Sequence, residues 1–279
     1  MPKALTEAQI AGYERDGFLF PVRVMSEEDT VGFHRLLAEA EAAGKLRGKG
    51  GQTKFYLRFP WVHALATNPA LLDMVEDLIG PDIMLYHNTM WAKSGGGHAY
   101  VSWHQDNTYF GHDPCEVLTV WFAITPATTE SGCMQFLPGT HRLGQLALKQ
   151  PDINDANLLS SGQTVDFDSA TVDPVPVELR PGEASIHHAF LIHGSLPNRS
   201  SEPRMGMTFI YHRPGLRQMG EARTSALLVR GEDRFNNFDH ESPPVREDDP
   251  ETVSRYRHAV SLYREKVREL GNRTIERFD

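Results

Sequence analysis

The sequence predicts one mainly β domain flanked by α-helices, with a sandwich or barrel at its centre. Helical patterns occupy residues 1–80, and short apolar runs separated by Gly, Pro, Asn and Asp occupy residues 81–215. A loop and one more helical pattern follow over residues 216–279. Because no internal repeat divides the chain, we expect residues 1–279 to form a single domain.

The first helices carry clear start and stop signals. Thr6 caps the first, which Gly17 ends, and Ser26 caps the second, whose apolar residues recur at helical spacing. Asn68 caps the third, with proline in the first helical position and an apolar stripe that stops at Gly80. These signals predict three helices ahead of the β region.

The central region reads as a series of short strands. The run 117–124 is almost continuously apolar and predicts a buried strand, whereas 172–179 alternates and predicts an edge strand. The runs that we interpret as strands are 83–93, 117–124, 134–137, 172–179, 184–193 and 205–212.

Two segments lack or change this strand pattern. Residues 145–170 show little periodicity and predict a long surface loop, of the kind that often covers a site. Asp249-Pro250 begins a last helix whose apolar residues recur at three-four spacing. We expect that helix to pack outside the β core.

Composition excludes several classes of protein. The formal net charge of −9 and the absence of a basic cluster argue against a nucleic-acid groove. No apolar stretch is long enough to cross a membrane, and no export signal opens the sequence. The two cysteines have neither metal-site nor disulfide-scaffold spacing, which suits a reducing compartment. We therefore expect a cytoplasmic protein that binds neither nucleic acid nor membrane; its oligomeric state stays open.

One short motif points to metal chemistry. His104 and Asp106 stand at positions i and i+2, and on an extended backbone both side chains point to the same side. With His193 they would complete the two-histidine, one-carboxylate set that binds iron(II) and leaves three positions for a chelating 2-oxo acid and O₂. With 13 histidines in the chain, His104 could equally be a hydrogen-bonded core residue. His187 and His188, on the same run as His193, are expected to be structural.

An arginine follows the third candidate ligand at a useful distance. His193 ends one apolar run and Arg204 starts another eleven residues later. If the two strands are adjacent and antiparallel, the guanidinium lies near the metal and suits the far carboxylate of a dicarboxylate ligand. The alternative is a solvated arginine at the start of a strand.

Four ordered motifs resemble one known family. They are the segments 13–18, 104–106, 130–141 and 193–204, with the letters YERDGF, HQD, ESGCMQFLPGTH and HGSLPNRSSEPR. The chain resembles the phytanoyl-CoA dioxygenase family of iron(II)- and 2-oxoglutarate-dependent enzymes, over nearly its whole length. The resemblance implies a double-stranded β-helix, the jelly roll of cupin-like proteins.

The resemblance also implies roles for particular residues. His104, Asp106 and His193 would bind iron(II) and carry catalysis, and Arg204 would anchor 2-oxoglutarate. Three further residues are implied around this cosubstrate: Lys93, Trp121 and Ser195. Each has an ordinary alternative, as a surface lysine, a core aromatic or a turn serine.

Substrate choice is the part that the sequence predicts least. Halogenating members of the group carry a small residue in place of Asp106, so hydroxylation or another oxidative outcome is favoured. If several of the polar residues named below line a pocket, we expect the hydroxylated substrate to be a small polar metabolite (an amino acid, phosphonate or natural-product intermediate). Alternatives are desaturation, epimerisation or ring closure on the same scaffold, a carrier-bound substrate, and a non-catalytic cupin-like module. The polar residues that could line a substrate pocket, or be ordinary strand and loop residues, are Tyr56, Arg58, Asn88, Asn107, Tyr109, Gln135 and His212.

Overall fold

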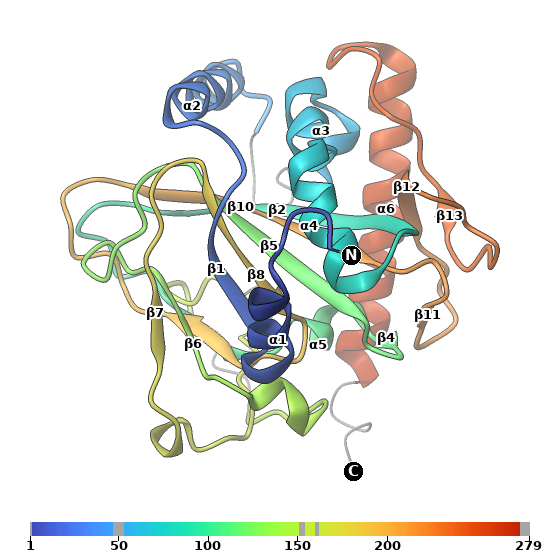
Figure 1. The fold of residues 1–279 in the computed structure, drawn as a ribbon. Coiled ribbons are helices and arrows are strands. Elements are labelled where there is room, and N and C mark those ends of the chain that lie inside the picture. Colours follow the sequence, from blue (N-terminus) through green and yellow to red (C-terminus); the bar gives the residue numbers. More distant parts are fainter. Residues whose placement is uncertain (1, 47–52, 151–153, 160–161, 274–279) are drawn as a thin grey trace.

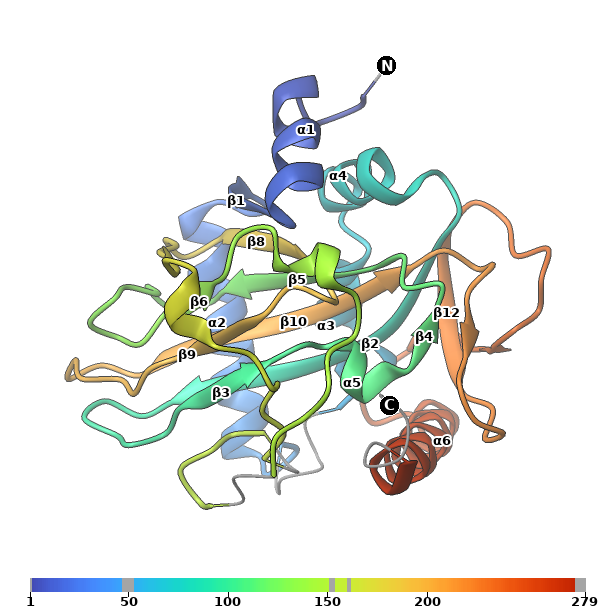
Figure 2. The same cartoon turned by 90° about the horizontal axis from the view of Figure 1, so that it is seen from below.

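The computed structural model describes residues 2–46, 53–150, 154–159 and 162–273 (Figure 1). Two β-sheets face each other as a jelly roll, and helices cover the outer face of the larger one, as the turned view in Figure 2 shows. No helix among these residues is long and apolar enough to cross a membrane.

The larger sheet has seven strands and supplies the floor of the site. In spatial order its strands are β1 (Phe18–Arg23), β8 (Glu183–His188), β5 (Val117–Ala123), β10 (Arg204–His212), β2 (Ile83–Lys93), β12 (Ser225–Arg230) and β13 (Asp239–His240). Its long central strands pair antiparallel, so alternate residues point to opposite faces.

The smaller sheet has four strands and lies over the inner face of the larger one. Its order is β3 (Val101–His104), β9 (His193–Ser195), β6 (Met134–Phe136) and β7 (Val175–Val177). A separate two-stranded pair joins β4 (His112–Asp113) to β11 (Arg217–Gln218). Residues from the larger and the smaller sheet line one pocket, so a site can form in the space between these two sheets.

The helices follow the predicted caps closely. They are α1 (Glu7–Asp16), α2 (Glu27–Ala42), α3 (Pro60–Ala66), α4 (Pro69–Ile79), α5 (Asn107–Phe110) and α6 (Pro250–Arg273), with short 3₁₀ turns η1 (Phe55–Leu57), η2 (Thr140–Leu143) and η3 (Ser169–Thr171). Thr6 makes the predicted capping box, and Gly17 ends α1 with a φ of 85°. Ser26 and Asn68 cap α2 and α4.

The main core lies between these helices and the outer face of the larger sheet. Phe33 and Leu37 of α2 and Val75 of α4 belong to the same buried cluster as Phe122 and Phe209 of the sheet. Burying large apolar side chains of this kind stabilises a fold by roughly 1.5–3 kcal/mol each. This core fixes the sheet and therefore the inward-facing residues on its other side.

Helices α3 and α5 were not predicted, and three features of the strands differ from the sequence prediction. Strand β1 lies within the part predicted as helical and pairs with β8, and β12 joins the larger sheet although it follows residue 215. The run 184–193 is not one strand. After β8, Leu191 N–H donates to the His188 carbonyl at 2.9 Å, and this turn sends His193 into the other sheet.

Two further predictions concern the loop and the last helix. Within the described part of 145–170 no helix or strand precedes η3, but Val165 is buried with Leu137 and Ile192, so this segment packs against the smaller sheet. Helix α6 passes from one face of the larger sheet to the other at its β12 side. Tyr256 belongs to the main core on the outer face of the larger sheet. Tyr263 packs against a second buried cluster, on the inner face, that includes Met84, Tyr86 and Phe110.

Candidate active site

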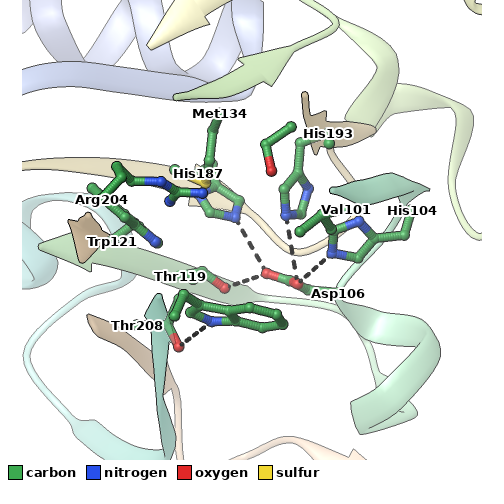
Figure 3. Close-up of a pocket in the computed structure, with 13 residues that line it drawn as sticks. Val101, His104, Asp106, Thr119, Trp121, Met134, His187, His193, Arg204 and Thr208 are labelled. Atoms are coloured by element: carbon green, nitrogen blue, oxygen red, sulfur yellow. Dashed lines mark hydrogen bonds and ion pairs between the residues drawn. The ribbon is translucent and has the colours of Figure 1, made fainter. Parts of the chain in front are cut away.

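Three candidate metal ligands meet between the two sheets. His104 ends β3 and His193 begins β9, and these residues face each other in the antiparallel pair, with ring centroids 4.1 Å apart. Asp106 lies at the start of α5. The three residues offer ligand atoms that all lie within 4.8 Å of one another. Figure 3 shows the two imidazoles directed at the carboxylate of Asp106.

The path of the backbone to Asp106 differs from the prediction. Strand β3 stops at His104, and Asp106 has helical φ and ψ of −60° and −37° as the N-cap of α5. The extended i, i+2 geometry was therefore wrong, although the two side chains do come together. The next residue, Asn107, donates its N–H to the Ala189 carbonyl at 3.1 Å, which holds the start of α5 against the turn after β8.

Backbone carbonyls orient both imidazoles. His104 Nδ1 lies 2.9 Å from the Ser102 carbonyl, and His193 Nδ1 lies 3.0 Å from the Leu191 carbonyl. A carbonyl can only accept, so each Nδ1 carries the proton and each Nε2 keeps its lone pair. The two Nε2 atoms lie 3.5 and 3.7 Å from Oδ1 of Asp106. Burial lowers the pKa of His193 well below its ordinary value, which favours the neutral ligand form.

The other oxygen of the carboxylate is held by the floor of the site. Thr119 Oγ1 donates to Asp106 Oδ2 at 2.6 Å, and His187 Nε2 lies 3.2 Å from the same oxygen. Burial alone would raise the pKa of Asp106, but His193, His104 and His187 together hold it well below its ordinary value. The set of two free imidazole nitrogens and one free carboxylate oxygen fits a first-row metal such as iron(II).

Arg204 is a buried cation in the same pocket. It is 2% exposed, its guanidinium lies 5.2 Å from the Trp121 ring, and its Nε has no hydrogen-bond partner. Burial lowers its pKa to about 10, so it stays charged at neutral pH. No carboxylate of the described residues pairs with it, and an unpaired buried charge is costly unless a ligand neutralises it.

The route by which Arg204 reaches the site differs from the prediction. Strands β9 and β10 belong to different sheets, so His193 and Arg204 do not lie on adjacent antiparallel strands. The two residues approach because the sheets face each other, and both line the pocket shown in Figure 3.

Of the three residues implied around the cosubstrate, Trp121 and Ser195 line the pocket directly. Lys93 stands opposite Arg204 on the neighbouring strand, and its Nζ donates to Ser195 Oγ at 2.6 Å and to the Leu196 carbonyl. Burial, and then the charge of Arg204, lower the pKa of Lys93 to about 7. Lys93 therefore supports the pocket wall from behind Ser195.

The seven polar residues suggested for substrate lie outside the lining of this pocket. Tyr56 is fully buried and donates to Glu241 at 2.7 Å, and the Asn107 side chain brackets the backbone of His112. Arg58 donates to the Lys45 carbonyl at 3.1 Å.

The remaining four have different surroundings. Asn88 Oδ1 accepts from the backbone of η1, His212 Nδ1 lies 2.8 Å from the Arg213 carbonyl, and Gln135 lies on β6. The ring of Tyr109 lies 6.4 Å from that of His104, and its hydroxyl donates to Gln163. Substrate contact by any of the seven stays a prediction.

Sequence reasoning overlooked two residues that shape the site, Thr119 and Gly206, and expected a third, His187, to be structural without naming its partner. Thr119 and His187 hold Asp106, and Gly206 makes room for Trp121, because a Cβ at position 206 would lie 2.0 Å from the indole. A glycine inside an apolar strand is a signal of close approach. Thr119 gave the weaker signal of a polar residue inside a buried strand.

A jelly roll that holds two histidines and one carboxylate in a buried group defines a class, the mononuclear non-haem iron oxygenases. The family description "Phytanoyl-CoA dioxygenase (PhyH)" matches residues 13–206, and the chain belongs to this family of iron(II)- and 2-oxoglutarate-dependent dioxygenases. The predicted fold and enzyme class are confirmed.

Individual relatives are more distant. The chain is 26% identical over 230 residues to a methylphosphonate hydroxylase of Gimesia maris, covering 76% of this chain and 82% of that protein. It is 30% identical over 150 residues to a probable phytanoyl-CoA dioxygenase of Caenorhabditis elegans, a match over 51% of this chain that spans only 48% of that protein. The solved structure "non-heme monooxygenase; ThoJ apo" superposes with a TM-score of 0.84 and 25% identity, over 95% of this chain and 99% of that one.

Proposed function

We propose that this chain hydroxylates an unactivated C–H bond of a small polar metabolite, consuming 2-oxoglutarate and O₂ and releasing succinate and CO₂. The observation that carries the proposal is the buried, unpaired guanidinium of Arg204 beside the group of His104, Asp106 and His193. A module that only binds metal has no need of a buried cation there. 2-Oxoglutarate explains it, because its second carboxylate pairs with the guanidinium.

Each side chain then has a defined task. His104 and His193 would hold iron through Nε2 and Asp106 through Oδ1, while Arg204 binds the far carboxylate of 2-oxoglutarate. Iron(II) bound in this way, with its cosubstrate and O₂, supplies the oxidising power for C–H cleavage. The protein's contribution is to fix the ligands, exclude water and position one C–H bond. The apolar rings of Trp91 and Trp121 and the side chain of Met134 line the pocket and serve that exclusion.

The retained carboxylate supports hydroxylation. Asp106 occupies the position where a halogenating enzyme carries a small residue, and Thr119 and His187 fasten it there. A small polar substrate, rather than an acyl-CoA, is supported by the acidic chain, whose formal net charge is −9, because the phosphates of an acyl-CoA want a basic surface. The relative named methylphosphonate hydroxylase is also consistent with a small substrate.

The proposal is tested by anaerobic titration of the iron(II)-loaded protein with 2-oxoglutarate, followed by the weak visible band of a chelated 2-oxo acid. We expect the band in the wild type, and for Arg204→Ala an affinity for 2-oxoglutarate weaker by about 10- to 100-fold, the loss expected for hydrogen bonds to a charged group. Arg199→Ala is the matched control, because Arg199 is an exposed arginine in the segment that connects β9 to β10. Bound iron without any band would support the binding-module alternative.

A further inference from the structure

We propose that His87 and Tyr263 bind a neutral polar group of the substrate, at an end of the active site that lies across the sheet from Asp106. The inference rests on the proposed function and deepens it. The expected substrate carries an uncharged group that forms hydrogen bonds at this end, such as a hydroxyl or a carboxamide.

Strand register places His87 in line with the floor of the metal site. His87 of β2 pairs with Ile210 of β10, Ile210 pairs with Thr119 of β5, and Thr119 pairs with His187 of β8. His87 is thus two strands from Thr119, or about 10 Å at the usual strand spacing. Arg204 lies in another direction, along β10 rather than across the strands. A ligand that reaches Arg204 therefore does not extend toward His87, which lies beyond the lining of the pocket in Figure 3.

The imidazole of His87 is incompletely satisfied. Its residue is 4% exposed, and Nε2 lies 2.7 Å from Thr89 Oγ1. Nδ1 is buried without a hydrogen-bond partner. Buried polar atoms of native proteins nearly always have partners, so an unpartnered one near an active site points to a ligand.

Helix α6 completes this end with an aromatic wall. The ring of Tyr263 stacks on His87 at 4.1 Å with an interplanar angle of 20°. Tyr109 of α5, beside His104, packs against the same buried cluster as Tyr263, and α5 and α6 lie side by side in Figure 2. Tyr263 also lies outside residues 13–206, the part of the chain that matches the family.

The groups at this end are neutral. Burial and the charge of Lys54 lower the pKa of His87 well below its ordinary value, and burial raises that of Tyr263. Lys54 itself is paired with Glu241 at 2.7 Å. Neutral donors and acceptors recognise a hydroxyl or amide, whereas a phosphonate dianion requires charged donors such as arginine. This favours the natural-product type of substrate over a phosphonate.

The test compares two probes, 4-hydroxybenzamide and methylphosphonate, by calorimetric titration into the anaerobic protein loaded with iron(II) and 2-oxoglutarate. We expect the neutral probe to bind the wild type more tightly than methylphosphonate. In Tyr263→Phe, which keeps the stacked ring, and in His87→Gln, which keeps an atom able to bond Thr89, its dissociation constant should rise about tenfold. Tyr256→Phe, on the same helix in the outer core, is the control.

The titrations distinguish a failure of this inference from a failure of the proposed function. Tighter binding of methylphosphonate, no binding of the neutral probe, or unchanged affinity in both variants would overturn the inference. Calorimetry does not depend on the 2-oxo acid band. Binding of the neutral probe by a protein that shows no such band would therefore contradict the proposed function and leave the recognition of neutral groups standing.

Discussion

Thr119 and His187 face each other on neighbouring strands, and both bond to the same oxygen of Asp106. This relationship leaves the other oxygen directed at the two Nε2 atoms of His104 and His193. The carboxylate is thereby prevented from turning, and groups that orient a metal ligand in this way contribute to metal affinity.

Removing the Thr119 hydroxyl should weaken iron binding while leaving the fold intact. We expect Thr119→Val to lower iron(II) affinity by about 10- to 100-fold, because the valine keeps the shape and loses the donor. Thr119→Ser keeps the donor and should stay near the wild-type value. Anaerobic metal titration gives both affinities, and native affinity in the valine variant would show that the hydroxyl does not position Asp106.

Removing an imidazole should abolish iron binding outright. His104→Ala and His193→Ala each delete one of the three proposed ligands, so we expect no stoichiometric iron(II) and no succinate release. His98→Ala, which removes an exposed histidine, should behave as the wild type. Circular dichroism confirms that the variants fold. An iron-replete, active His193→Ala protein would contradict the ligand assignment.

A single methyl group at position 206 should damage the proposed 2-oxoglutarate site. In Gly206→Ala the new Cβ would lie 2.0 Å from the Trp121 ring, on which Arg204 is stacked. We expect a loss of about 1–3 kcal/mol in the free energy of unfolding and a weaker affinity for 2-oxoglutarate. Urea denaturation measures the first and the 2-oxo acid band the second. Replacing the indole as well, in Gly206→Ala with Trp121→Phe, should recover part of the stability.

Acid should destabilise the protein partly through Glu269. Burial would raise the pKa of this carboxyl, but the N–H groups of Glu221 and Ala222 and the ammonium of Lys266 outweigh it and lower the pKa to about 2, from an ordinary 4.5. A lowered pKa in the folded state gives stability that is present above about pH 4.5 and is lost as the pH falls toward 2.

The matching variant is Glu269→Gln, which keeps the shape but cannot ionise. We expect it to unfold at lower urea concentration than the wild type at pH 7, and the difference between the two proteins to shrink as the pH falls below about 4.5. A difference that stayed constant down to pH 3 would show that ionisation of this carboxyl does not contribute.

Local signals predicted four of the helices, α1, α2, α4 and α6, but not α3 or α5. Thr6, Ser26 and Asn68 cap α1, α2 and α4 as expected, because a cap is a contact between residues close in sequence. Strand β2 was also predicted with its observed bounds. Strand β1 was not, because it is defined by pairing with β8, which the sequence does not record locally.

For the site as well, the residue types were predicted but the contacts between distant segments were not. The types and order of His104, Asp106, His193 and Arg204 pointed to iron and a dicarboxylate, and the structure does bring these four side chains into one pocket. The predicted backbone paths to these residues were wrong, because α5 and the turn after β8 depend on contacts between distant segments. Which inward-facing residue meets Asp106 depends on strand register, so the contact between Thr119 and Asp106 could not be predicted from the sequence.

The pairing of β1 with β8 has a consequence for how the chain folds during translation. Phe18 pairs with His187, so β1, which is synthesised before β8, stays without this partner until β8 has left the exit tunnel. His193 emerges only after β8, and β12 later still. The metal-binding group therefore cannot assemble while the N-terminal helices are being made, and iron is loaded late in translation or after it.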